Sequence, residues 1–249
     1  MNEAYRNISL IFEVERAIKF LRLGLSEIQK ISAANDFYDP VFIYLSSGLE
    51  RLFKAMLCLN HKELNKRFPK TGEIWDNKNG HDILFLKQRI EEICILTPGD
   101  FAQNDLDSIT KNSFINSICL VLSEYGSKSR YFNLDAVLGK KQEFDSKKEW
   151  EKLETQVCKE LYGEANFLKM LGPPNQLDKV YEDSNKEIII RLETFFRALA
   201  RQFVFGNFSS EANTYYHIIQ DFSNIEDEQL GLTDYASFKN DQQIKRSNL

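Results

Sequence analysis

Three charged residues on one predicted helix have the types and spacing that can hold a phosphate group. Glu50 and Lys54 lie four positions apart and can form an ion pair, and Arg51 lies beside them. All three fall on the polar edge of an otherwise apolar helix. Such an edge can bind the phosphate of a ligand, or it can be a solvated face with an internal ion pair.

A histidine at the start of the next predicted helix is a second candidate. His81 follows Gly80 and precedes Asp82. At a helix N-terminus it could act as a general base or donate to a phosphate. In the structural alternative, His81 bonds loop carbonyls while Asp82 helps to cap the first turn.

The third candidate is the sequence Arg130-Tyr131-Phe132. It lies in the segment 126–152, which has seven basic and five acidic residues, a balance of +2, whereas the whole chain carries −5. An arginine beside aromatic residues can contact a phosphate and stack on a base. Alternatively, the aromatic rings plug a helical bundle and the arginine pairs with a carboxylate.

Several other classes of site are excluded or disfavoured. The four cysteines, at 58, 94, 119 and 158, form no CxxC pair, so we expect free thiols in a reducing compartment and no metal site. Cys58 and His61 lack a second pair of ligands. There is no glycine-rich phosphate loop and no Gly-x-Ser-x-Gly elbow, and we expect no cofactor. No apolar run approaches the roughly 20 residues of a membrane span, so a cytoplasmic protein without membrane contact is expected.

The segments that must position these residues are predicted to be helices. Only 11 glycines and 5 prolines interrupt the chain, and apolar residues recur at three- and four-residue steps. We therefore expect an all-α fold, an antiparallel bundle of long amphipathic helices, with Leu49 and Leu52 in its core and close approach of a neighbour at residues 46–48. The expected helices span about 8–31, 40–60, 82–97, 104–125, 147–171, 176–205 and 210–222.

The expected organisation has one main bundle. Residues 1–145 are predicted to form its core, and residues 146–223 to add helices packed on the same bundle. Residues 224–249 turn polar and acidic and are predicted to form a C-terminal tail.

The stretch Tyr44–Leu57, which reads YLSSGLERLFKAML, resembles the second helix of HEPN domains. The later Gly80-His81-Asp82, which opens another apolar helix, is similar to a second feature of that family. The resemblance covers about residues 8–135 and implies an antiparallel helical bundle found in prokaryotic toxin and phage-defence systems. Many such domains are dimeric, metal-independent ribonucleases, while others bind nucleotides or serve as interaction modules.

The ribonuclease motif of that family, an arginine followed a few residues later by histidine, is absent. The nearest preceding arginines are too distant: Arg51 is ten positions before His61, Arg67 is fourteen before His81 and Arg201 is sixteen before His217. The catalytic pair of the family therefore has no counterpart here.

Three functions remain open from the sequence. In the first, the protein is HEPN-like, lacks standard ribonuclease activity, and binds RNA, a nucleotide or a partner protein in a bacterial stress or defence setting. In the second it is a ribonuclease with a rearranged site that uses Arg130 and His81. In the third it is a structural subunit of an assembly, with the aromatic stretch 195–205 as its interface. A homodimer is predicted, with the same Phe-rich helix as a plausible seam.

Overall fold

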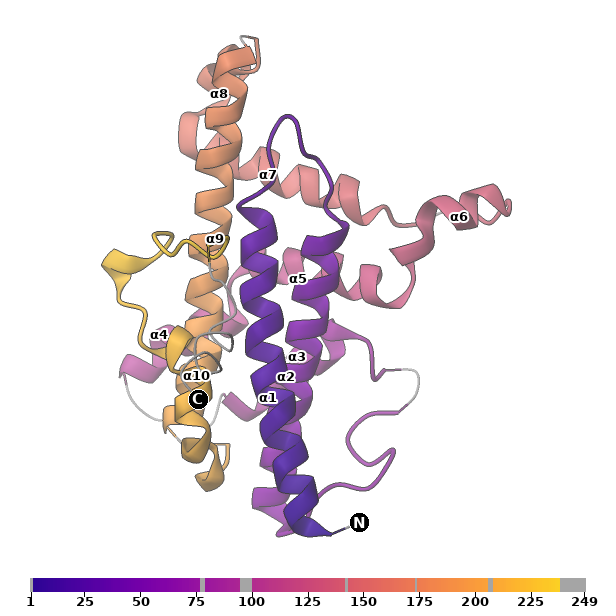
Figure 1. The fold of residues 1–249 in the computed structure, drawn as a ribbon, viewed down its shortest axis with the longest axis vertical. Coiled ribbons are helices and arrows are strands. Elements are labelled where there is room, and N and C mark those ends of the chain that lie inside the picture. Colours follow the sequence, from indigo (N-terminus) through magenta and orange to yellow (C-terminus); the bar gives the residue numbers. More distant parts are fainter. Residues whose placement is uncertain are drawn as a thin grey trace, which may run out of the picture.

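The structure, a computed structural model, describes residues 2–76, 79–94, 100–141, 143–172, 174–205 and 208–237. Over these ranges the chain is helical, without strands, apart from one isolated bridge between Ser32 and Asn35. The all-α prediction is confirmed. The α-helices are α1 (Glu3–Ile28), α2 (Asp39–Asn65), α3 (Ile83–Cys94), α4 (Asp100–Thr110), α5 (Ser113–Ser127), α6 (Phe132–Val137), α7 (Ser146–Tyr162), α8 (Glu164–Met170), α9 (Pro174–Phe205) and α10 (Tyr216–Ser223) (Figure 1).

The two longest N-terminal helices, α1 and α2, form a close antiparallel pair (Figure 1). Two glycines make this approach possible. A Cβ atom on Gly48 would lie 2.7 Å from Leu21 Cδ2, and one on Gly24 would lie 2.4 Å from Leu45 Cδ2. The predicted close approach at residues 46–48 is thus confirmed, and it sets which side of α2 faces α1.

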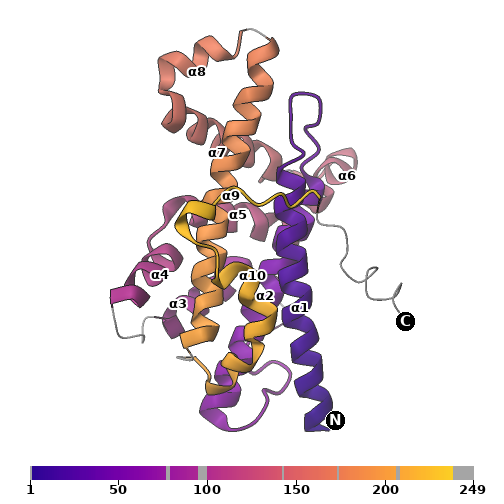
Figure 2. The ribbon, with the colours of Figure 1, turned by 60° about the vertical axis from the view of Figure 1, so that its left-hand side comes forward.

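The other helices surround this pair. Helices α3 and α5 pack against α2, α7 packs against α5 and α9, and α9 runs beside α1 with α10 folded against it (Figure 2). Leu49 and Leu52 are buried in the core, at 0% and 2% exposure, as predicted. One cluster of buried side chains includes residues from α1 through to Tyr235. No described helix has the length and apolar character needed to cross a bilayer.

Three predicted helices differ in the structure. The predicted helix 210–222 is a 3-10 helix, η2 (Ser210–Tyr215), followed by α10, and two longer helices are each broken into two α-helices. The predicted helix 104–125 is α4 and α5, because the Asn112 side chain accepts a hydrogen bond from the Ile115 backbone N–H at 3.2 Å and caps α5. The predicted helix 147–171 is α7 and α8, because Gly163 adopts a positive φ of 73°. The apolar period continues across both breaks, which is why the sequence pattern did not reveal them.

The aromatic stretch of α9 does not form an exposed interface. Phe195, Phe196 and Phe203 are each no more than 1% exposed, and their rings contact those of Phe222 and Phe208. Of the predicted seam, only Val204 and Phe205 are substantially exposed, at 37% and 41%. Phe195, Phe196 and Phe203 fill the core of the chain itself, so the prediction that they form a dimer seam or assembly interface is wrong.

The connection between α5 and α7 projects from the bundle. It contains a short 3-10 helix, η1 (Ser129–Tyr131), followed by α6, which stands away from the body at the right of Figure 1. We call residues 129–141 the arm. The segment 66–82 between α2 and α3 protrudes on the same side of the molecule, and residues 77–78 within it lie outside the described ranges.

Other predicted ends of helices fall outside the described residues. The predicted helix 82–97 ends within residues 95–99, and the predicted helices 147–171 and 176–205 are followed by residue 173 and residues 206–207, none of which is described. Of the predicted tail, residues 224–237 are described. There Tyr235 is buried, and its hydroxyl donates to Glu193 Oε1 at 2.7 Å, so this part of the tail packs on α9.

A buried carboxyl group joins α7 to the start of α2. Glu154 accepts hydrogen bonds from the Tyr38 hydroxyl at 2.8 Å and from Trp150 Nε1 at 3.0 Å. Burial raises the pKa of the Glu154 carboxyl from 4.5 to about 7. At neutral pH this group is therefore close to half protonated.

We expect Glu154 to make stability pH-dependent. Between about pH 4.5 and pH 7 the folded chain keeps a proton that the unfolded chain releases, so the free energy of unfolding falls as pH rises through this interval. A full proton corresponds to about 1.4 kcal/mol per pH unit. Denaturant unfolding across this interval should show a shallower slope for Glu154→Gln than for the wild type. Identical slopes would mean that Glu154 ionises normally.

Candidate functional site

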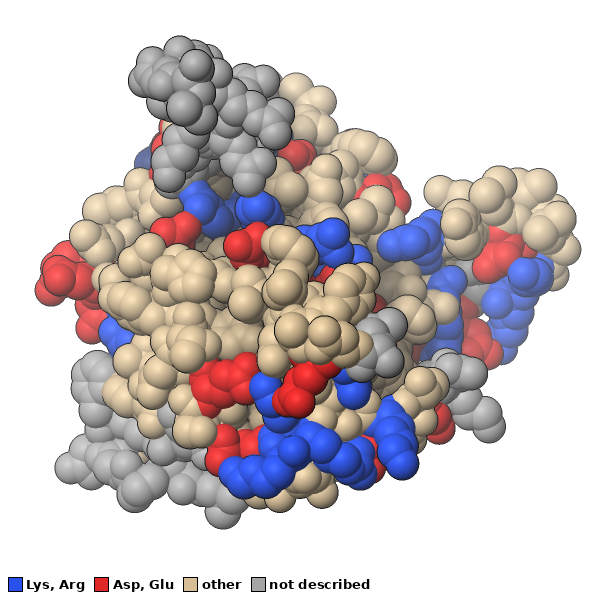
Figure 3. Space-filling model, turned by 60° about the horizontal axis from the view of Figure 1, so that its bottom comes forward, with Lys and Arg blue, Asp and Glu red and all other residues tan. Residues whose placement is uncertain are grey.

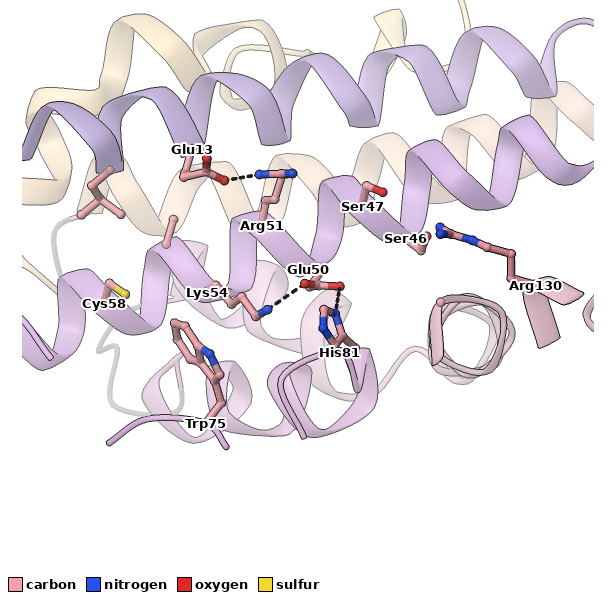
Figure 4. A pocket seen from close by; sticks show the side chains of 13 residues that line it. Glu13, Ser46, Ser47, Glu50, Arg51, Lys54, Cys58, Trp75, His81 and Arg130 are labelled. Carbon is pink, nitrogen blue, oxygen red and sulfur yellow. Dashed lines mark hydrogen bonds and ion pairs between the residues drawn. The ribbon is translucent and has the colours of Figure 1, made fainter. Parts of the chain in front are cut away.

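A cavity of about 550 Å³ opens along α2, between the segment 66–82 and the start of the arm (Figure 4). We call it the α2 cavity. Five of the six ligand-binding candidates line it, although they come from three separate segments of the chain. Its walls are formed by Leu10, Glu13, Ser46, Ser47, Glu50, Arg51, Lys54, Ala55, Cys58, Trp75, His81, Gly126 and Arg130.

Helix α2 supplies the charged side of the cavity. Lys54 Nζ lies 2.7 Å from Glu50 Oε1, which confirms the predicted i,i+4 pair, and both side chains are partly buried. Arg51 points across to α1, where it pairs with Glu13, and its guanidinium lies 5.5 Å from the centre of the Phe20 ring. The ion pairs hold the Lys54 and Arg51 side chains at the cavity. Each side chain keeps N–H groups that can donate to a ligand, because a lysine has three N–H donors and an arginine five.

His81 completes a chain of three polar groups. Its Nδ1 lies 3.1 Å from Glu50 Oε2, so Glu50 contacts Lys54 through one oxygen and His81 through the other (Figure 4). The His81 side chain is 68% exposed and bonds this carboxylate, where loop carbonyls were the expected partners. The predicted cap is confirmed, since Asp82 Oδ1 accepts from the Phe85 backbone N–H at 3.0 Å.

Arg130 reaches the same cavity from the arm. Its guanidinium lies 5.8 Å from the centre of the Tyr125 ring and points toward Ser46 in Figure 4. The structural alternative, in which Arg130 pairs with a carboxylate, is wrong within the described part of the chain, where no carboxylate lies within ion-pair distance. The cavity thus holds three cations, on Arg51, Lys54 and Arg130, against the two carboxylates of Glu13 and Glu50.

The remaining wall is less polar. Trp75 packs on the core, and Lys54 Nζ lies 5.4 Å from the centre of its ring. Cys58 is also present, but burial raises the pKa of its thiol to about 11. The thiol is therefore protonated at neutral pH, which argues against a nucleophilic role.

Tyr131 is the one candidate that lies outside the α2 cavity. It is 60% exposed and lines a second cavity, of about 480 Å³, which Arg130 also lines. The two remaining histidines lie elsewhere: His61 is 3.7 Å from Glu73, and the exposed His217 contacts the Thr214 carbonyl. Among the described residues, no group of three or more His, Cys, Asp and Glu side chains is placed to bind a metal.

Sequence reasoning missed two residues of the site. Glu13 lies on α1 and meets Arg51 only because of the α1–α2 register, which no local pattern encodes. Trp75 lies in the segment 66–82, and its position on the cavity wall depends on the path of that segment. The only indication of this role in the sequence was a single tryptophan within a polar loop.

Comparison with known proteins identifies no relative. No protein-family model, no curated protein and no solved structure matches the chain. The resemblance to HEPN domains therefore rests on residues 44–57 and 80–82 alone.

Proposed function

We propose that this chain is a HEPN-like binding protein that holds the phosphate groups of RNA or of a nucleotide in the α2 cavity. The observation that carries the proposal is the convergence of Arg51, Lys54 and Arg130, from two distant segments, on one recess with a surplus of positive charge. Charge-assisted hydrogen bonds from such groups are the ones that proteins use for phosphate.

Size and electrostatics both support a local site. Ligand pockets typically measure about 300–1,000 Å³, and the α2 cavity, at about 550 Å³, lies within that range. The chain carries −5 overall, and the face in Figure 3 mixes basic and acidic side chains. Attraction of a polyanion must then come from a confined cluster of cations rather than from a field over the whole surface.

A recess favours a small ligand or an RNA segment over a protein partner, which would need a broad surface.

The bacterial stress or defence setting follows from the HEPN resemblance and is part of the proposal. We also propose that the chain forms a homodimer, whose interface must lie outside the Phe-rich stretch of α9. Light scattering of the purified chain at micromolar concentration should give the mass of a dimer, and a monomer would contradict it.

A second candidate function, a ribonuclease with a rearranged site, is favoured by the contact between His81 and Glu50. When Nδ1 carries the ring proton it donates to Glu50, which leaves Nε2 as a base for the ribose 2′-hydroxyl. Arg130 lines the same cavity and could neutralise charge on the phosphate in the transition state.

Incubation of the purified chain with total RNA separates the two functions. The binding proposal expects the RNA to be retained intact. Cleavage that disappears in His81→Ala and persists in His217→Ala would replace binding with catalysis, because His217 is exposed and outside the cavity. If RNA and nucleotides are neither bound nor cleaved at low salt, both functions are wrong.

A further inference from the structure

The second cavity adjoins the first, and Arg130 lines both. The second cavity lies between the turn at residues 36–39, the start of the arm and the start of α7. We call it the arm cavity. Because Arg130 lines both cavities, a phosphate bound by its side chain would place its attached group near the mouth of the arm cavity.

Six of the residues that line the arm cavity are aromatic: Phe37, Tyr38, Phe42, Tyr125, Tyr131 and Phe132. Phe37 is 61% exposed and Tyr131 is 60% exposed, and they come from different segments. Exposed rings at the edge of a recess offer a flat apolar ligand two surfaces for stacking. Nucleobases bind to proteins in this way.

The charge balance of the arm cavity is opposite to that of the α2 cavity. Asp36, Asp39 and Asp145 give three carboxylates against the two cations of Arg130 and Lys147. A phosphate is therefore better placed in the α2 cavity. Carboxylates are acceptors only, so the arm cavity suits a group rich in N–H donors.

Asp39 is the carboxylate best placed to accept such donors. Asp36 Oδ2 already accepts a hydrogen bond from Lys147 Nζ at 2.6 Å. Asp145 Oδ1 accepts one from the Lys148 backbone N–H at 3.2 Å and so caps α7. The Asp39 side chain is bonded by the Tyr125 hydroxyl at Oδ1, at 2.9 Å, and by no other group in the described ranges. Its Oδ2 and the second lone pair of its Oδ1 are thus available to a ligand. Of the common bases, guanine presents two adjacent donors, N1–H and the N2 amine, to one carboxylate.

We propose that the arm cavity binds the base of the nucleotide whose phosphate lies in the α2 cavity, and that Asp39 makes this base guanine. The inference rests on the proposed phosphate site. Guanine stacks against Tyr131 and Phe37, and its Watson–Crick edge meets Asp39. Uracil, with one N–H donor between two carbonyl acceptors, is disfavoured at the same carboxylate.

Calorimetric titration with three probes, pyrophosphate, GDP and UDP, tests the base site separately from the phosphate site. We expect GDP to bind the wild type about tenfold or more tightly than UDP, in line with the discrimination of a paired hydrogen bond. Asp39→Asn should abolish this preference, because an amide donates where guanine also donates. Tyr131→Ala should weaken the binding of GDP by about 5- to 150-fold, the usual range for stacking, and leave the affinity for pyrophosphate unchanged.

The matched control is Val137→Ala on the same arm, because Val137 is 82% exposed and outside both cavities. It should bind all three probes as the wild type does. Unchanged pyrophosphate binding in Tyr131→Ala and Asp39→Asn shows that these variants are folded.

The outcomes separate the two proposals. If pyrophosphate binds but GDP is no tighter than UDP, or if Asp39→Asn keeps the preference, the guanine assignment is overturned and the phosphate site stands. If none of the probes binds, the phosphate site itself is wrong, and the base site falls with it. Where GDP is preferred, a short RNA with 5′-phosphoguanosine, compared with one carrying 5′-phosphouridine, identifies the source: the same preference in the RNA shows that an RNA end also fits the site, and a preference confined to the free nucleotides assigns a free nucleotide.

Discussion

Replacing both Arg51 and Lys54 with glutamine should lower the affinity for pyrophosphate by at least about 100-fold. A hydrogen bond to a charged group is worth about 1.5–3 kcal/mol, and this double variant removes two cationic donors. It also leaves Glu13 and Glu50, their present partners, as uncompensated negative charges in the cavity. Calorimetric titration at low ionic strength measures the loss directly.

The control for this double variant removes the same charge elsewhere. Lys66 and Lys152 are exposed, pair with the nearby Glu63 and Glu149, and lie outside both cavities. Lys66→Gln combined with Lys152→Gln should reduce the affinity only slightly, because exposed charges act through screened, long-range attraction. An equal loss in both double variants would mean that net charge, and not the α2 cavity, governs binding.

The second large effect concerns the helix that carries the site. Leu49→Ala should lower the free energy of unfolding by about 2–5 kcal/mol, because Leu49 is fully buried and its truncation leaves a cavity. Leu64→Ala is the matched control, since Leu64 lies on the same helix and is 73% exposed. It should change stability by no more than about 0.5 kcal/mol. Comparable losses in the two variants, measured by denaturant unfolding, would show that the buried face of α2 is misplaced.

Periodicity was a good guide to which residues of α2 are buried and a poor guide to where helices end. Leu49 and Leu52 follow the three- and four-residue steps that define a buried stripe. Asn112 and Gly163 interrupt helices without interrupting the stripe, since a cap or a positive φ depends on one residue. Hydrophobic content also misled at Phe195 and Phe203, because an aromatic cluster suits a core as well as an interface.

The candidate site shows the same division. The spacing of Glu50 and Lys54 on one helix is enough to predict their ion pair. The arrival of His81 and Arg130 at that pair depends on how α3 and the arm pack, which the sequence pattern does not contain. The residue types therefore identified the six candidates one at a time, and tertiary packing brought five of them together in the α2 cavity.

Intrinsic fluorescence tests the central claim, ligand binding in the α2 cavity, most directly. The chain has two tryptophans: Trp75 lines the cavity, whereas Trp150 is buried in the core at 1% exposure. Titration with GDP should produce a saturable fluorescence change that persists in Trp150→Phe and disappears in Trp75→Phe. An absent change in the wild type, or an undiminished change in Trp75→Phe, would contradict a ligand site in this cavity.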